Sequence, residues 1–220
     1  MNAGRPRSFC TDTALDRAMT VFWRKGYEGA SLSDLTGAMG INPPSLYAAF
    51  GNKEGLFRAV LERYDGRRKD LMDRVLAAPD ARSVAQRYLE GVAEFAVDTS
   101  GRNPPGCLLV QSGLSCSDQD IPDALAQHRA EKERALRARF ERDRKDGNLP
   151  KTANPVALAR YLVAMANGMC VQAAAGASTK ELGEVAKIAL AAWPVNEPST
   201  EKAAKILKTK KTSRATQLSH

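Results

Sequence analysis

Cysteine and histidine are the residue types in this chain that could carry redox, metal-binding or acid–base chemistry. The four cysteines, Cys10, Cys107, Cys116 and Cys170, are far apart, and no two of them form a C-x-x-C pair. This spacing does not indicate a disulfide framework and fits free thiols in a reducing compartment. A redox or metal-thiolate role for Cys107, Cys116 or Cys170 stays open. Because free cysteine is among the most often buried residue types, we expect mostly buried, apolar thiols.

Catalysis has little support in the sequence. Only two histidines are present: His128 lies in a highly charged segment, and His220 is the last residue. The chain contains no Walker loop, no H-E-x-x-H or G-x-S-x-G motif, and no spaced Cys/His set. We therefore expect a protein that is not an enzyme and has no metal site or other cofactor.

One stretch predicts two short helices around a tight turn. Ser31 and Asp34 have the spacing of a capping box at the start of the first helix. Gly40 ends that helix, since glycine adopts the left-handed conformation that a helix terminus often needs. Asn42 caps the second helix, and Pro43 occupies its first position. Two helices joined in this way form a helix-turn-helix, whose second helix can lie in a DNA major groove.

The second helix has an inward face and an outward face. Leu46 and Phe50, four residues apart, point inward, and Gly51 ends the helix. The residues left outside are Ser45, Tyr47, Ala48 and Ala49, and Lys53 follows directly. Small, polar and tyrosine side chains followed by a lysine favour a DNA-binding surface over an ordinary helical hairpin.

The whole stretch resembles a known DNA-binding domain. The segments G-Y-E-G-A-S-L-S-D-L and G-I-N-P-P-S-L-Y-A-A-F-G-N-K-E-G-L are similar to those of TetR/AcrR-type transcriptional regulators. The resemblance implies an all-α, homodimeric, ligand-responsive repressor. It also implies that Ser45, Tyr47 and Lys53 contact phosphates of double-stranded DNA, and that Pro43, Pro44 and Ala48 face its bases.

Direct base readout by the second helix is thin, because this helix contains no Arg, Gln or Lys. Ser31 and Ser33, at the start of the preceding helix, complete the predicted DNA-binding set. Contact with thymine methyl groups and the shape of the DNA are then expected to carry more of the specificity.

The composition permits a DNA partner without specifying the fold. The 220 residues can bury a full core, and the net charge is +8. Residues 195–220 are Lys-rich, and we expect a disordered basic tail there. The N-terminal residues are polar and basic, and no stretch approaches the ~20 uninterrupted apolar residues of a membrane span. These features predict a cytoplasmic protein without a membrane partner.

The rest of the chain is expected to be helical. Apolar periodicity predicts helices over residues 12–25, 53–76, 82–97, 122–145, 154–175 and 178–193. The apolar run 107–114 is too short to assign by periodicity alone, and in a chain of helices we expect a helix there as well. We expect about nine helices in an all-α fold: a three-helix DNA-binding domain over residues 1–52, extended to about 65, and a ligand-binding and dimerisation domain over 66–194. The charged middle of the 53–76 helix (Asp65, Arg67, Arg68, Lys69 and Asp70) is expected to face solvent. So is most of the 122–145 helix.

A mostly apolar small molecule is predicted to bind between the 53–76 helix and the helices after it, where the resemblance implies a pocket. The candidates are adaptable apolar side chains with two glutamines to orient the ligand. They are Tyr64, Tyr88, Phe95, Leu109, Gln111, Met165, Met169 and Gln172.

The last two predicted helices are expected to form a four-helix bundle across a two-fold axis, with a near-palindromic operator as the consequence. Ala159, Ala166 and Ala173 would let the helices approach closely, and Trp193 would anchor the edge. The alternative is a dimeric small-molecule-binding or thiol redox-sensing module that does not depend on DNA. The effector, the operator and the direction of regulation are not specified by the sequence.

Overall fold

The computed structural model describes residues 10–98, 103–114 and 120–196, which fold into nine helices without a strand. The helices are α1 (Thr11–Gly29), α2 (Leu32–Met39), α3 (Pro43–Phe50), α4 (Lys53–Leu76), α5 (Ala81–Ala96), α6 (Leu108–Leu114), α7 (Asp120–Lys145), α8 (Pro155–Ala174) and α9 (Thr179–Ala191). The expected all-α fold of about nine helices is confirmed. Of the basic tail expected over residues 195–220, residues 197–220 lie outside the described residues.

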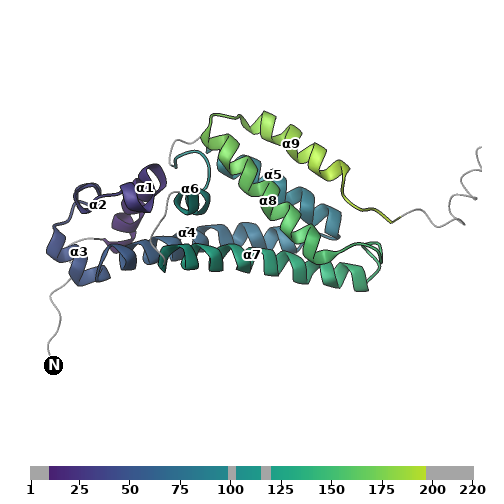
Figure 1. The fold of residues 1–220 in the computed structure, drawn as a ribbon, viewed down its shortest axis with the longest axis horizontal. Coiled ribbons are helices and arrows are strands. Elements are labelled where there is room, and N and C mark those ends of the chain that lie inside the picture. The colour runs from purple at the N-terminus through teal and green to yellow at the C-terminus, as the bar shows by residue number, and fades with distance from the viewer. Residues whose placement is uncertain (1–9, 99–102, 115–119, 197–220) are drawn as a thin grey trace, which may run out of the picture.

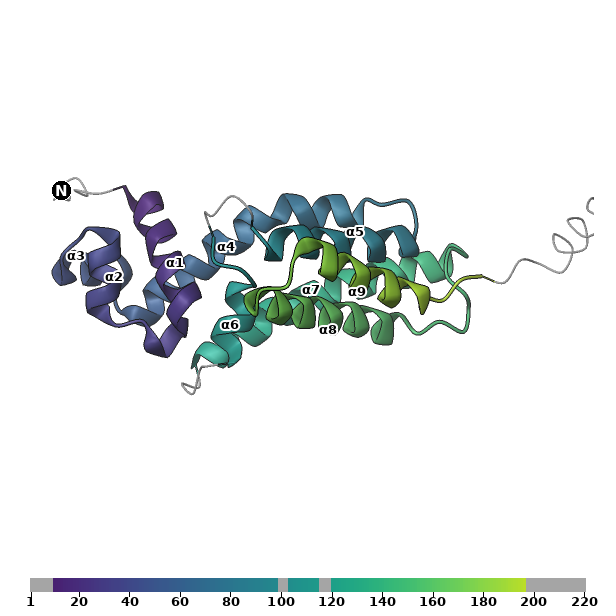
Figure 2. The ribbon, with the colours of Figure 1, turned by 90° about the horizontal axis from the view of Figure 1, so that it is seen from above.

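The molecule is elongated, and α4 runs from one part to the other (Figures 1 and 2). Helices α1–α3 and the first turns of α4 form a head at one end. The rest of α4 and helices α5–α9 form a body, in which α7 lies along α4 and α8 crosses between α7 and α5 (Figure 1).

The head is held together by aromatic packing and by ion pairs between α1 and α4. The Phe57 ring lies 4.9 Å from the Phe22 ring and 5.1 Å from the Tyr27 ring, centroid to centroid. Arg63 of α4 donates through Nη2 to Asp16 Oδ2 of α1 at 3.0 Å. The start of α4 is therefore part of the head's core.

A break in α1 coincides with the helix end expected at Gly26. This residue has φ 70° and ψ 176°, which is not helical, and helical backbone resumes up to Gly29. Because only glycine adopts such a positive φ easily, Gly26 redirects the chain toward α2.

Helix α8 is packed on several sides, as its nearly all-round apolar composition predicts. It contacts α5, α7 and α9. Within the described residues it is the one helix long and apolar enough to cross a membrane, and one such helix is weak evidence for a membrane span.

Helix α7 is fastened to the C-terminal end of α4. The buried Arg139 donates to Leu76 O at 3.1 Å and to Ala78 O at 2.7 Å. It also pairs with the buried Asp143 one turn further along α7. The expectation that the charged side of α7 is wet is therefore wrong at this point, because the last carbonyl groups of α4 need donors that the helix itself cannot supply.

Candidate DNA-binding surface and effector cavity

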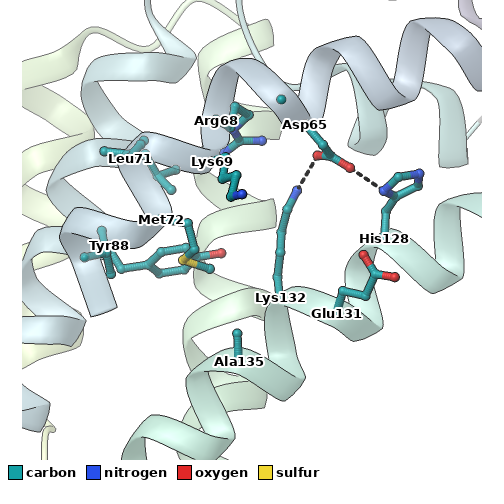
Figure 3. A pocket seen from close by; sticks show the side chains of 13 residues that line it. Asp65, Arg68, Lys69, Leu71, Met72, Tyr88, His128, Glu131, Lys132 and Ala135 are labelled. Carbon is teal, nitrogen blue, oxygen red and sulfur yellow. Dashed lines mark ion pairs between the residues drawn. The ribbon is translucent and has the colours of Figure 1, made fainter. Parts of the chain in front are cut away.

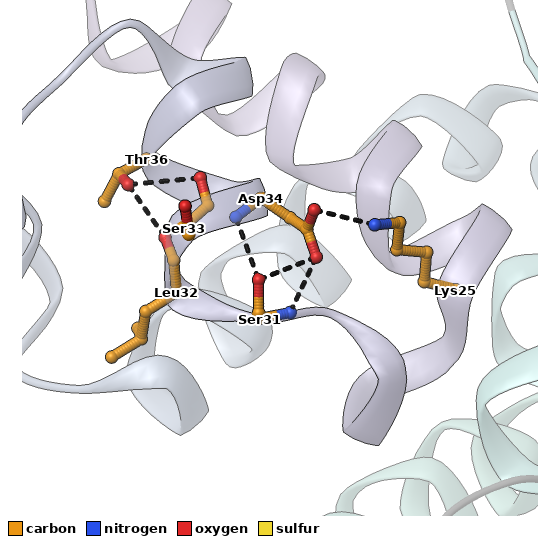
Figure 4. A network of polar contacts seen from close by, with 6 residues as sticks. All are labelled: Lys25, Ser31, Leu32, Ser33, Asp34 and Thr36. Carbon is orange, nitrogen blue, oxygen red and sulfur yellow. Dashed lines mark hydrogen bonds and ion pairs between the residues drawn. The ribbon is translucent and has the colours of Figure 1, made fainter.

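The start of α2 is fixed by a compact polar network (Figure 4). Asp34 N donates to Ser31 Oγ at 3.0 Å, while Ser31 N and Oγ donate to Asp34 Oδ2 at 3.1 and 2.7 Å. Lys25 of α1 donates to Asp34 Oδ1 at 2.7 Å. The hydrogen bond from Lys25, followed by those from Ser31, lowers the pKa of Asp34 to about 2. The expected capping box is confirmed, and the same carboxylate joins α2 to α1.

Helix α3 is held in place by an N-cap and by one buried leucine. Asn42 Oδ1 accepts a hydrogen bond from Ser45 N at 2.9 Å, and Leu46 is fully buried beneath the helix. The outward side consists of Pro43, Pro44, Tyr47 and Ala48, all exposed, and 47% of Tyr47 is accessible. Helix α3 itself lies at the end of the head away from the body (Figure 2).

Lys53 stands at the first position of α4 and is half-buried against α1. Its Nζ lies 4.6 Å from the centroid of the Tyr27 ring and donates to Glu28 O at 3.4 Å. Of the other predicted DNA contacts, Ser31 and Ser33 are exposed, while Ser45 is half-buried by its place in the first turn of α3. The predicted set thus comes from the starts of α2 and α4 and from α3.

The junction between α3 and α4 leaves no room for a side chain at Gly55. A Cβ atom there would lie 2.0 Å from the backbone oxygen of Phe50. Gly55 N also donates to the Asn52 side chain that caps α4, at 2.7 Å. This close approach sets the angle between α3 and α4.

A cavity of about 340 Å³ lies in the body between α4, α5 and α7 (Figure 3). Its polar wall includes Asp65, to which His128 and Lys132 of α7 both form ion pairs, the latter at 3.7 Å. The hydrogen bond with Asp65 raises the pKa of His128. Burial, followed by repulsion from Arg68, lowers the pKa of Lys132.

A second, smaller cavity of about 30 Å³ shares Arg68, Tyr88 and Lys132 with the first and adds two thiols. Arg68 Nη1 donates to Cys107 Sγ at 3.7 Å. Hydrogen bonding from Cys170 and the charge of Arg68 lower the pKa of Cys107, although burial acts in the opposite direction. The same pairing and burial raise the pKa of Cys170.

The aromatic residues expected in the pocket surround this thiol from the other side. Tyr64 Oη lies 3.1 Å from Cys107 Sγ, and Phe95 lies beneath Arg68, with 4.3 Å between the ring centroid and Cζ. Burial raises the pKa of Tyr88 to about 12, so this side chain is a neutral hydrogen-bonding group at neutral pH.

Only part of the predicted pocket set faces a cavity. Tyr88 lines both cavities and Leu109 lines the smaller one. The remaining six lie elsewhere: Tyr64 and Met169 are buried, Phe95, Gln111 and Met165 are half-buried, and Gln172 is exposed.

Sequence reasoning missed the charged wall of the cavity. Asp65 and Arg68 were expected to face solvent, but they line the cavity. His128 and Lys132 lie on a helix that was expected to be mostly wet, and they also line it. One signal was present: each pair recurs at three- or four-residue spacing and so shares a helix face. The expectation is wrong because α4 and α7 turn these faces toward each other.

The cysteines follow their expected burial in two places out of three. Cys107 and Cys170 are buried and Cys10 is exposed, while Cys116 lies outside the described residues. Among the residues whose placement is described, no group of three His, Cys, Asp or Glu side chains could hold a metal ion.

A helix-turn-helix head on a separate helical body defines a DNA-binding regulator rather than an enzyme. Residues 14–60 match the model of bacterial regulatory proteins of the tetR family. The Escherichia coli (strain K12) transcriptional repressor ComR is 38% identical over 200 residues, covering 87% of this chain and 92% of ComR. The E. coli repressor BdcR is 36% identical over 125 residues, covering 57% of this chain and 62% of BdcR.

A solved structure extends the similarity to the body. A cysteine-substituted variant of the TetR family regulator CifR, complexed with a 26-base-pair operator DNA, is 42% identical, with a TM-score of 0.81. The match covers 86% of this chain and 100% of that one. The present chain belongs to the tetR family of bacterial regulatory proteins, and it is a DNA-binding transcriptional regulator.

Proposed function

We propose that this protein is a cytoplasmic repressor that binds a near-palindromic operator as a homodimer and releases it when a small molecule occupies the body. The main support for DNA binding is the outward face of α3. Tyr47 and Ala48 are exposed on this face, while the buried Leu46 anchors the helix on its other side. Repression is supported by the relatives ComR and BdcR, both repressors. The head to about residue 65 would bind DNA, and residues 66–194 would bind the effector and dimerise.

Affinity and specificity come from different parts of the head. Ser45, Tyr47 and Lys53 contact phosphates, which position the head but carry no sequence information. Base edges are met by Pro43, Pro44 and Ala48, together with Ser31 and Ser33 at the start of α2. The short apolar groups on α3 make the shape of the operator an important part of recognition.

The homodimer is built on the outward faces of α8 and α9. Val171 on α8 and Ile188 on α9 are 43% and 74% exposed, although both are large apolar residues. Gly168, one turn before Val171, has open space where a Cβ would stand, so a second copy can approach α8 closely there.

The residues first expected at this interface are used inside the protomer. Ala159, Ala166 and Ala173 are buried against neighbouring helices, and Trp193 packs edge-on against Phe140 with 5.3 Å between ring centroids. That expectation is wrong because, in a helix that is apolar nearly all round, the sequence does not indicate which face packs against other helices of the same protomer.

The proposal is tested by titrating DNA from upstream of the protein's own gene and following fluorescence anisotropy at several salt concentrations. Each phosphate contact contributes about one unit to the slope of log affinity against log salt, so Lys53→Ala should flatten the slope by about 1. Tyr47→Phe should weaken binding to all sequences alike. Lys151→Ala, an exposed position between α7 and α8, is the matched control. An unchanged slope for Lys53→Ala would remove this residue from the phosphate contacts.

Thiol sensing is a second candidate function, favoured by one observation. Cys107 and Cys170 line the same small cavity, and Arg68 donates a hydrogen bond to Cys107 Sγ. A cation beside a thiol stabilises the thiolate, which is the reactive form. Such a signal would act on the DNA-bound regulator rather than replace DNA binding.

A further inference from the structure

Two cations in the body share the walls of both cavities. Arg68 of α4 and Lys132 of α7 line the larger cavity and the smaller one. Arg68 donates to Tyr64 Oη at 3.1 Å and to Cys107 Sγ at 3.7 Å, and its guanidinium lies over the face of Phe95. Over the described stretches of the chain, no carboxylate forms an ion pair with Arg68. Arg68 therefore stays charged beside a thiol of lowered pKa, a phenol and an aromatic ring, and among the described residues it has no carboxylate partner of its own.

Lys132 is in a similar position. Its ion pair with Asp65 is long, at 3.7 Å, and the same carboxylate is also paired with His128. Burial and the nearby Arg68 both disfavour its charged form. Figure 3 shows Lys132 reaching from α7 toward α4 along the edge of the cavity. Two cations that repel each other where little water reaches them are both stabilised by an anion placed between them.

The other side of the cavity is apolar. It is lined by Leu71, Met72 and Val75 of α4, Tyr88 and Val92 of α5 and Ala135 of α7. Its volume of about 340 Å³ is within the range of small-molecule sites. The lining also holds the carboxylates of Asp65 and Glu131, but the cations Arg68, Lys69 and Lys132 outnumber them. A ligand that fits both walls therefore has an apolar body and a single anionic end.

We propose that the cavity between α4, α5 and α7 binds an amphiphilic organic carboxylate, whose carboxylate pairs with Arg68 and Lys132 while its apolar body lies against Leu71, Met72 and Val92. The effector role of this ligand rests on the function proposed above. The carboxylate joins α4, which carries the head, to α7. Occupancy therefore acts on the relative position of these two helices, and a ligand shifts the regulator only by binding one arrangement better than the other.

The test compares three probes with the same chain and different head groups: decanoate, 1-decanol and decylamine. Binding to the full-length protein without DNA is measured by titration calorimetry at neutral pH. Decanoate should bind about tenfold to a hundredfold more tightly than 1-decanol, since hydrogen bonds to charged groups are among the stronger ones. Decylamine should bind more weakly than the alcohol.

Two variants assign the preference to the named cations. Lys132→Met and Arg68→Met keep an unbranched side chain but remove the charge, so each should bring decanoate and 1-decanol close to equal affinity. Arg134→Met, at an exposed position on the same helix as Lys132, should keep the wild-type preference. If Arg68→Met does not fold, Lys132→Met and the probe series on the wild type still decide the question.

The outcomes separate this inference from the proposed function. Equal binding of decanoate and 1-decanol to the wild type would overturn the carboxylate site, and so would no binding of either probe. An unchanged preference in Lys132→Met would also overturn it. Failure of the protein to bind upstream DNA would instead contradict the operator proposal, and it would leave the calorimetric result standing.

Discussion

Replacing Gly55 by alanine should disturb DNA binding more than folding. The added Cβ would lie 2.0 Å from Phe50 O, and real Cβ atoms essentially never approach closer than 3.0 Å. The α3–α4 junction must therefore open by about 1 Å, and such overpacking typically costs about 1–3 kcal/mol. Alanine recovers up to about 1 kcal/mol through its better helix propensity.

Gly66 on the same helix supplies the control, because nothing lies within 4 Å of its Cβ position. Gly66→Ala should gain stability by up to about 1 kcal/mol, so the two variants should differ by about 1–3 kcal/mol in the free energy of unfolding. Denaturant unfolding of both proteins measures this difference.

The functional effect follows from the displacement of α3. Loss of one hydrogen bond to a charged phosphate, worth about 1.5–3 kcal/mol, lowers operator affinity by about tenfold to 150-fold. Fluorescence anisotropy should therefore show a much weaker complex for Gly55→Ala and near-wild-type affinity for Gly66→Ala. Equal affinity of the two variants would refute the idea that Gly55 sets the position of α3.

Three further predictions concern the interface, the thiol and the head. Gly168→Arg should convert the dimer into a folded monomer in light scattering, whereas Ala138→Arg, at an exposed position on α7, should leave it dimeric; a dimer in both would exclude this face of α8. Cys107 and Cys170 are both buried, but the pKa of Cys107 is lowered and that of Cys170 is raised, so iodoacetamide should modify Cys107 faster than Cys170 at neutral pH, as followed by mass spectrometry; equal rates would contradict the lowered pKa of Cys107. Asp34 has a folded-state pKa of about 2, below its unfolded value, so its stabilising effect is present above about pH 4 and lost as the pH falls toward 2. Asp34→Asn should therefore reduce the loss of unfolding free energy between about pH 4 and pH 2. An unchanged loss would show that other groups produce it.

The parts of the head that were predictable from sequence depend on neighbours in the chain. Ser31 with Asp34 and Asn42 with Ser45 are contacts across three residues, so side-chain chemistry and spacing alone specify them. Gly40 has φ 70°, which follows from its position at the end of α2. The helix stripes were predictable for the same reason, since one face of each helix must be apolar.

The cavity was not predictable in the same way. Lys132 and Arg68 are charged residues on helices with abundant charge, and solvent exposure is the usual fate of such residues. Their burial depends on which face of α7 meets α4, and the narrow apolar stripe of α7 does not specify that. For Ala166 on α8 the problem is reversed, because apolar residues surround the helix and only the tertiary packing selects the covered face.

The hydrogen bonds from Arg139 to Leu76 O and Ala78 O hold the C-terminal end of α4 in place, so any swing of α4 would pivot about this end, near residue 77. At about 1.5 Å per residue, Arg68 lies about 14 Å from this pivot and Lys53 about 36 Å from it. A swing of α4 that moves Arg68 by about 1 Å would carry the start of α4 through about 2.7 Å, since the ratio of the two arms is about 2.7. If α3 reads DNA as proposed, a shift at the cavity no larger than a side-chain adjustment would be magnified at α3, where one base step spans only about 3.4 Å.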